Sequence, residues 1–134
     1  MRVLAVDDEP DSLRLVRELL TQAGHQVMTA QTAVEAMVHV HVSPFDLVVL
    51  DLRMPEIDGL QFAQFLAGQW NAFEIPIIVV SCRTDAESKS WAKLNGCVQY
   101  LEKPFSPVEF LDAVAQVNAS QLQSSLPPAS KGAF

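Results

Sequence analysis

Residues 47–50 are the sequence feature that most restricts how this chain can fold. They are four consecutive apolar residues, Leu-Val-Val-Leu, and Asp51 follows them directly. A short apolar run without polar alternation is typical of a strand buried on both faces, as in a parallel sheet. Pro55 and the pair Asp58-Gly59 then favour a loop. The sequence therefore predicts that Asp51 lies at the carboxyl end of a buried strand, where open α/β sheets place their ligands.

Four further apolar segments are predicted strands, and helical segments separate all five. The predicted strands are Arg2–Val6, Gln26–Ala30, Leu47–Leu50, Pro76–Val80 and Val98–Leu101. The predicted helices follow Glu9, Gln31, Asp58-Gly59, Arg83 and Phe105, and four of them open with a capping box or a proline. Such alternation requires a mostly parallel sheet with right-handed crossovers. We predict an α/β fold, a five-stranded parallel sheet of order 2-1-3-4-5 with five helices on both faces.

The domain organisation follows from length and composition. The chain has 134 residues, enough for one domain with a real core, and 49% of them are hydrophobic. We expect residues 1–118 to form this domain and residues 119–134, rich in Ser, Gln, Pro and Ala, to form a tail or linker. The two cysteines, Cys82 and Cys97, are too few for a disulfide framework and are expected to be buried free thiols.

Net charge and hydropathy indicate which kinds of binding partner the protein can have. The formal net charge is -7, which argues against direct binding to nucleic acid and suits a metal cation or a protein partner. No apolar stretch approaches the length of a membrane span, and the first residues do not resemble a secretion signal. We therefore expect a cytoplasmic protein without a membrane partner.

Polar residues follow four of the five predicted strands. They are Asp7 and Asp8, Asp51, Ser81, and Lys103. In a parallel sheet these residues meet at one edge, where three close carboxylates repel one another, so the site needs a cation or must stay partly protonated. Magnesium prefers such oxygen ligands, and the absence of cysteine and histidine from this set makes zinc a poor candidate. A carboxylate, a divalent cation, a hydroxyl and an ammonium group together suit phosphoryl transfer to an aspartate.

These residues resemble those of a known family, the receiver domain of bacterial two-component response regulators. The matching segments are Val6–Glu9, Leu50–Gly59, Val80–Ser81 and Lys103–Phe105. The resemblance implies that Asp51 accepts a phosphoryl group from the phosphohistidine of a sensor histidine kinase or a histidine phosphotransfer protein.

The same resemblance implies a role for each remaining residue of the site. Asp8, Asp51 and the backbone carbonyl of Arg53 would bind Mg²⁺ directly, and Asp7 would bind it through water. Lys103 would contact the phosphoryl group and would precede a cis peptide bond to Pro104.

The resemblance also implies a conformational switch with a protein output. Ser81 would move toward the phosphoryl group, and Tyr100 would turn inward to fill the vacated space. The fourth helix, fifth strand and fifth helix would then present the signal to a downstream protein or to an output domain outside this chain. Trp91, on the predicted fourth helix, is either a core residue or an exposed anchor for such a partner.

Three residues are predicted at the rim of the pocket. Cys82 follows Ser81 where the family usually has a smaller residue, and we expect an inert buried thiol rather than a redox sensor. Arg53 and Arg83 each lie two residues beyond a site residue. One interpretation is that they attract anionic donors and limit the access of hydrolytic water; the other is that they are simply solvated.

Two alternative functions are considered beside the receiver domain. A degenerate receiver would only bind partners, although all the acidic and basic residues of the site are present here. A magnesium-dependent aspartyl-phosphate phosphatase usually has a second aspartate two residues after its nucleophile, where this chain has Arg53. We therefore expect no turnover enzyme, only catalysis by the domain of its own phosphorylation and dephosphorylation.

Overall fold

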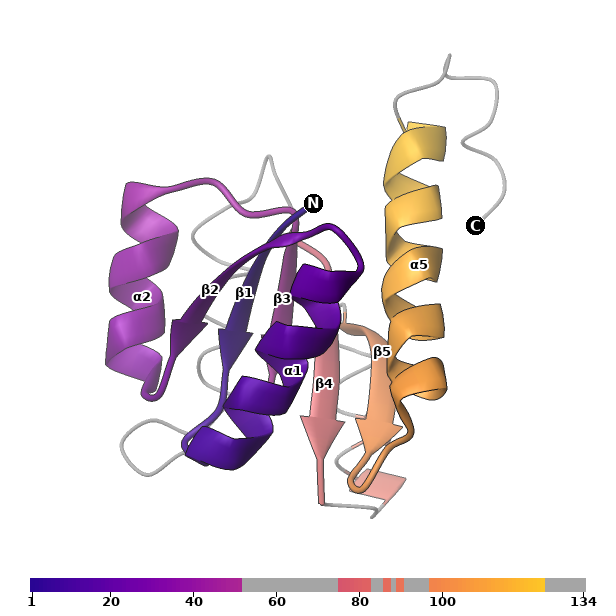
Figure 1. Cartoon of the computed structure of the whole chain (residues 1–134), viewed down its shortest axis with the longest axis horizontal. Helices are drawn as coiled ribbons and strands as arrows, with labels where there is room; N and C mark the ends of the chain where they lie inside the picture. Colours follow the sequence, from indigo (N-terminus) through magenta and orange to yellow (C-terminus); the bar gives the residue numbers. More distant parts are fainter. Residues whose placement is uncertain (52–74, 83–85, 88, 91–96, 125–134) are drawn as a thin grey trace.

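The computed structural model describes residues 1–51, 75–82, 86–87, 89–90 and 97–124. Within these residues, five strands form one parallel sheet of order β2-β1-β3-β4-β5, which is the order predicted from the sequence. The strands are β1 (Arg2–Val6), β2 (Gln26–Ala30), β3 (Leu47–Leu50), β4 (Ile77–Ser81) and β5 (Cys97–Glu102). Because every pairing is parallel, the carboxyl ends of the strands lie together at one edge of the sheet (Figure 1).

Three helices are described, and they cover both faces of the sheet. They are α1 (Pro10–Gln22), α2 (Ala33–Val42) and α5 (Pro107–Ser124). The predicted third helix lies outside the described residues. Of the predicted fourth helix, only residues 86–87 and 89–90 are described, and their backbone is helical. The number of helices predicted from the sequence is therefore confirmed only for these three.

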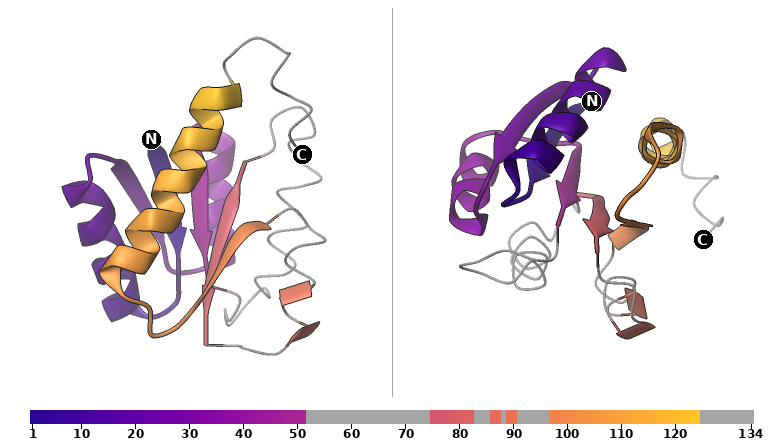
Figure 2. Two further views of the ribbon diagram at one scale, coloured as in Figure 1. Left: turned by 90° about the vertical axis from the view of Figure 1, so that its right-hand side faces the viewer. Right: turned by 60° about the horizontal axis from the view of Figure 1, so that its bottom comes forward.

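The core has two layers, one on each face of the sheet. On one face, α1 and α5 pack against alternate strand residues such as Val3 and Val49, and Phe110 of α5 is completely buried there. On the other face, α2 packs against Leu4 and Leu50. Figure 2 shows α5 lying along the sheet, with α2 on the far side. Every residue of β3 is buried. Both faces of the strand are therefore covered, which explains why its sequence is apolar throughout and does not alternate with polar residues.

Local sequence signals fix where the helices begin and end. The Thr32 hydroxyl accepts a hydrogen bond from the Glu35 amide at 3.1 Å, and Ser106 does the same for Glu109 at 3.0 Å. Pro10 is the first residue of α1, where no amide hydrogen is needed. Gly24 follows α1 with φ of 93°, a conformation that favours glycine.

The C-terminal helix is longer than the sequence predicted. We expected regular structure to give way to a tail from Asn118 onward, whereas α5 continues to Ser124. No glycine or proline occurs between Pro107 and Pro127, and alanine and glutamine in this segment favour a helix. The expectation was wrong because a polar composition alone does not end a helix. The division into residues 1–118 and 119–134 stays a prediction.

Two smaller points complete the fold. Strand β4 includes Ser81, one residue beyond its predicted end, and β5 extends one residue further than predicted at each end. Across the described part of the chain, no helix combines the length and the apolar composition that crossing a bilayer requires.

Candidate functional site

Backbone hydrogen bonds extend the sheet past the ends of its strands and position the polar residues. The Asp7 amide donates to the Ala30 carbonyl at 3.1 Å, and the Asp51 amide donates to the Val6 carbonyl at 3.0 Å. The Lys103 amide donates to the Ser81 carbonyl at 2.9 Å. Each polar residue is therefore fixed to the neighbouring strand by its own backbone.

Three carboxylates meet at this edge. Asp7, Asp8 and Asp51 each offer an oxygen atom, and these oxygens all lie within 4.8 Å of one another. Asp7 and Asp51 are buried, whereas Asp8 is exposed. Oxygen ligands at this spacing, open to water on one side, fit a magnesium ion that keeps part of its hydration shell. The residues therefore fit the metal that the sequence predicted.

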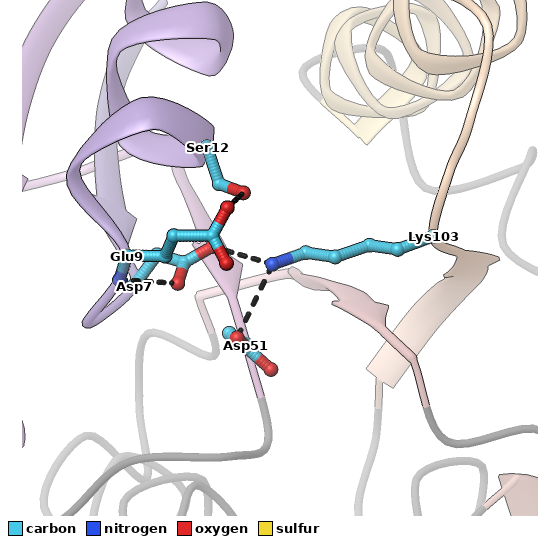
Figure 3. A network of polar contacts seen from close by, with 5 residues as sticks. All are labelled: Asp7, Glu9, Ser12, Asp51 and Lys103. Atoms are coloured by element: carbon cyan, nitrogen blue, oxygen red, sulfur yellow. Dashed lines mark hydrogen bonds and ion pairs between the residues drawn. The ribbon is translucent and has the colours of Figure 1, made fainter.

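Lys103 joins two of the three carboxylates. Its ammonium nitrogen lies 2.7 Å from Oδ2 of Asp7 and 3.2 Å from Oδ2 of Asp51. Figure 3 shows the side chain extending across the carboxyl edge of the sheet to reach both groups. Only 15% of the Lys103 side chain is exposed, so these charge-assisted hydrogen bonds are weakly screened by solvent.

Burial and the neighbouring charged groups shift the pKa values of Asp7 and Lys103 in opposite directions. Burial raises the pKa of Asp7 above its ordinary value, although hydrogen bonds from Lys103 and from the Glu9 amide oppose the increase. Burial also tends to lower the pKa of Lys103, but the hydrogen bond to Asp7 and the charges of both carboxylates outweigh it and raise that pKa. The lysine therefore stays cationic at neutral pH.

Glu9 and Ser12 support the cluster, and the sequence reasoning assigned neither of them a role. The Glu9 amide donates to Oδ1 of Asp7 at 3.0 Å, which leaves Oδ2 for Lys103. The Ser12 hydroxyl in turn donates to the Glu9 carboxylate at 3.0 Å (Figure 3). The three-residue spacing of Glu9 and Ser12 at the start of α1 was the available signal, since residues three apart face one another on a helix.

The two predicted switch residues lie on neighbouring strands. Ser81, at the end of β4, is completely buried. Tyr100 of β5 pairs with Val79 and is partly buried against the core cluster on the α2 face. The Lys89 ammonium group lies 6.0 Å from the centre of the Tyr100 ring and forms an ion pair with Glu102. The aromatic ring thus has a cation beside it and apolar core beneath it.

Other predicted site residues have mixed outcomes. The peptide bond between Lys103 and Pro104 is cis. Cys82 is exposed, so the expectation of a buried thiol was wrong for this residue. Strand β4 ends at Ser81, so Cys82 lies beyond the sheet and its side chain reaches solvent. Arg53, Arg83 and Trp91 lie outside the described residues, as does the side chain of Cys97.

The parallel sheet and its acidic edge define a class of signalling domains, and comparison with known families agrees. Residues 3–115 match the family model of the response regulator receiver domain. The chain therefore belongs to the receiver-domain family of two-component response regulators.

Among curated proteins, one relative is the transcriptional regulatory protein KdpE of Mycobacterium tuberculosis. It is 42% identical over 109 residues, which cover 81% of this chain and 47% of KdpE. The chain thus spans about half the length of this relative. Protein PilH of Pseudomonas aeruginosa is 30% identical over 118 residues, covering 88% of this chain and 98% of PilH.

Solved structures show the same fold. The chemotaxis protein CheY4 of Vibrio cholerae aligns with a TM-score of 0.81 and 32% identity, covering 87% of this chain and 97% of CheY4. The response regulator TrrA of Thermotoga maritima, solved in complex with Mg²⁺ and BeF, aligns with a TM-score of 0.77 and 29% identity over 87% of this chain and 97% of TrrA.

Proposed function

We propose that Asp51 is the phosphoacceptor of this receiver domain and that it takes its phosphoryl group from the phosphohistidine of a sensor histidine kinase or a histidine phosphotransfer protein. The observation that carries this proposal is the arrangement of Asp51 beside Asp7 and Asp8, with Lys103 in contact with Asp7 and Asp51. Membership of the receiver family and the Mg²⁺–BeF complex of TrrA support it.

The chemical step is a direct transfer to a carboxylate oxygen. An oxygen of Asp51 attacks the phosphorus atom and forms the new P–O bond while the P–N bond to the donor histidine breaks. The imidazole nitrogen leaves with the electron pair of that bond and takes up a proton. The Lys103 ammonium, which already contacts Asp51, is placed to pair with a phosphoryl oxygen as negative charge accumulates.

Magnesium belongs to the proposed resting site. Asp8, Asp51 and the backbone carbonyl of Arg53 would hold the ion directly, and Asp7 would hold it through water. When bound, the ion supplies positive charge to three repelling carboxylates and to the phosphoryl oxygens. The Glu9 amide and Lys103 both bind the Asp7 carboxylate, and this orientation would suit a contact with the ion through water.

Phosphorylation is proposed to act on Ser81 and Tyr100. A phosphoryl group on Asp51 would attract the Ser81 hydroxyl, and Tyr100 would then turn inward from its partly buried position. The cation beside the Tyr100 ring and the ion pair between Lys89 and Glu102 would have to change with it. The surface around β5 and α5 would thereby report the state of Asp51 to a partner.

The relatives differ in how much of their own length this chain covers. The chain spans 47% of KdpE, a transcriptional regulatory protein, and 98% of PilH. Either a linked output domain or a separate downstream protein is consistent with the proposed switch. Direct binding of nucleic acid by this domain is not proposed, because its formal net charge is -7. The effects of Arg53, Arg83 and Cys82 at the pocket rim stay predictions.

The experiment is phosphorylation by acetyl phosphate with Mg²⁺, followed by intact-mass spectrometry. We expect one added phosphoryl group on the unaltered chain. No phosphoryl group should appear on Asp51→Asn or after chelation of the metal. Asp11→Asn, which removes an exposed carboxylate from the first turn of α1, is the matched control and should be phosphorylated normally.

Two results would contradict the proposal. If the unaltered chain gains no phosphoryl group, or if Asp51→Asn gains one equally, the domain is better described as an interaction module. Rapid turnover of a simple phosphate ester would instead favour the phosphatase alternative.

A further inference from the structure

The Lys89 side chain contacts two residues of β5. Its ammonium group forms an ion pair with the Glu102 carboxylate and lies 6.0 Å from the centre of the Tyr100 ring. Tyr100 and Glu102 are two residues apart on one strand, so their side chains project from the same face of the sheet. Lys89 lies in the described part of the predicted fourth helix, and one side chain therefore joins that segment to both the ring and the carboxylate.

The ring and the carboxylate act on the same ammonium group. A cation over the face of a tyrosine ring is attracted by the negative charge of that face. Because the Glu102 carboxylate also binds the ammonium group, it keeps the cation beside the ring. Movement of Tyr100 away from its present position would separate the ring from the cation. The contact with Lys89 therefore opposes that movement.

Glu102 also lies close to the proposed phosphorylation site. In the sheet it is the partner of Ser81, the residue proposed to move when the domain is phosphorylated. The residue that follows it is Lys103, whose ammonium group contacts two of the clustered carboxylates. A contact that fixes the Tyr100 ring thus has one of its two anchors directly beside the proposed switch.

We propose that Lys89, paired with Glu102, is a positioning residue that keeps Tyr100 in its partly buried position while the domain is unphosphorylated. This inference rests on the proposed function, in which Tyr100 turns inward when Asp51 is phosphorylated. Removing the cation should shift the equilibrium of the ring toward the inward position. The Lys89 and Glu102 side chains are 44% and 47% exposed, so solvent partly screens their charges. We therefore expect a shift of about two- to fivefold in this equilibrium.

The chain contains a single tyrosine, so incorporation of 3-fluorotyrosine places one fluorine label on the Tyr100 ring. The reference measurements are the ¹⁹F NMR spectra of the full chain before and after phosphorylation by acetyl phosphate with Mg²⁺. The test is the spectrum of unphosphorylated Lys89→Met, which keeps most of the side-chain length and removes the charge. We expect its signal to move from that of the unphosphorylated chain toward that of the phosphorylated chain.

Further variants separate the charge contact from a merely structural effect. Lys89→Arg keeps a cation that can pair with Glu102 and lie over the ring, so its signal should stay close to that of the unaltered chain. Arg17→Met is the matched control: it removes an exposed cation from α1, on the sheet face opposite Tyr100, and should leave the signal unchanged. Glu102→Gln should move the signal in the same direction as Lys89→Met. The two substitutions together should move it no further than Lys89→Met alone, because they remove one interaction.

The outcomes distinguish this inference from the proposed function. If phosphorylation moves the fluorine signal but Lys89→Met does not, the role of Lys89 is wrong and the proposed function stands. Equal shifts in Lys89→Met and Arg17→Met, or a shift in Lys89→Arg as large as that in Lys89→Met, would also overturn the role of Lys89. A chain that gains no phosphoryl group contradicts the proposed function, and the inference about Lys89 then fails with it.

Discussion

Replacing Lys103 by methionine isolates the electrostatics of the acidic edge. Methionine keeps most of the side-chain length and removes the charge, so two buried carboxylates, Asp7 and Asp51, lose the cation that contacts both of them. Unit charges about 3 Å apart attract by about 5 kcal/mol at an effective dielectric constant near 20. Part of this attraction offsets the desolvation of Lys103 itself, so we expect a loss of about 2–4 kcal/mol in the free energy of unfolding.

Lys89→Met provides the matched control. Lys89 also pairs with a carboxylate, that of Glu102, but the two side chains are 44% and 47% exposed. Exposed pairs of this kind typically contribute less than about 1 kcal/mol. Urea unfolding of both variants at neutral pH, with a chelator present to remove divalent metal, measures the difference directly. Equal losses for Lys103→Met and Lys89→Met would refute the reasoning.

The effect of Lys103→Met should also depend on pH and on magnesium. Without the ammonium group, the pKa of Asp7, already raised by burial, should rise further. A raised folded-state pKa stabilises the protein below the unfolded-state value and loses that contribution as pH rises, so the destabilisation should shrink toward pH 4. Saturating Mg²⁺ should restore part of the stability at neutral pH, because an ion held by the proposed site would bind the folded state and not the unfolded one.

Three further predictions concern the rest of the fold. Phe110→Ala should lower the free energy of unfolding by about 3–5 kcal/mol because this ring is completely buried, whereas Val108→Ala on the exposed side of α5 should change it by less than about 0.5 kcal/mol in the same urea titration. Thr32→Ala should lower it by about 1 kcal/mol through loss of the α2 cap, and Thr32→Ser should not. Burial and the nearby N-terminal amino group lower the pKa of His25, so an NMR titration of its ring should have a midpoint below 6.5, and stability should fall as His25 becomes protonated.

The sheet could be predicted because each of its strands is marked by a short apolar segment of the sequence. Apart from Arg2 at the start of β1 and Ser81 at the end of β4, strands β1, β3 and β4 are apolar throughout, so no polar residue within them suggests an exposed face. Parallel strands must also share a carboxyl edge. Asp7, Asp51 and Lys103 follow three such strands, so their meeting follows from topology once the strand order is known. The strand order was predicted from the alternation of strands and helices, because 2-1-3-4-5 is a common order for a five-stranded parallel sheet.

Other features depend on contacts that no sequence pattern records. The exposure of Cys82 depends on the exact residue at which β4 ends, and sequence patterns locate element ends only approximately. The length of α5 depends on helix propagation through Ser120 and its neighbours, where the sequence has neither a strong stop nor an apolar stripe. The orientation of Asp7 depends on the Glu9 backbone amide, a donor that every non-proline residue has and that no side-chain motif reveals.

The contact between Lys103 and Asp7 joins residues separated by 96 positions in the chain. Within the described residues β5 pairs with β4 alone, so β3 and β4 separate it from β1 in the sheet. The first half of the chain therefore contains the three acidic residues but not the lysine. If Asp51 is the phosphoacceptor proposed above, the site would therefore be complete only once the last strand has joined the sheet.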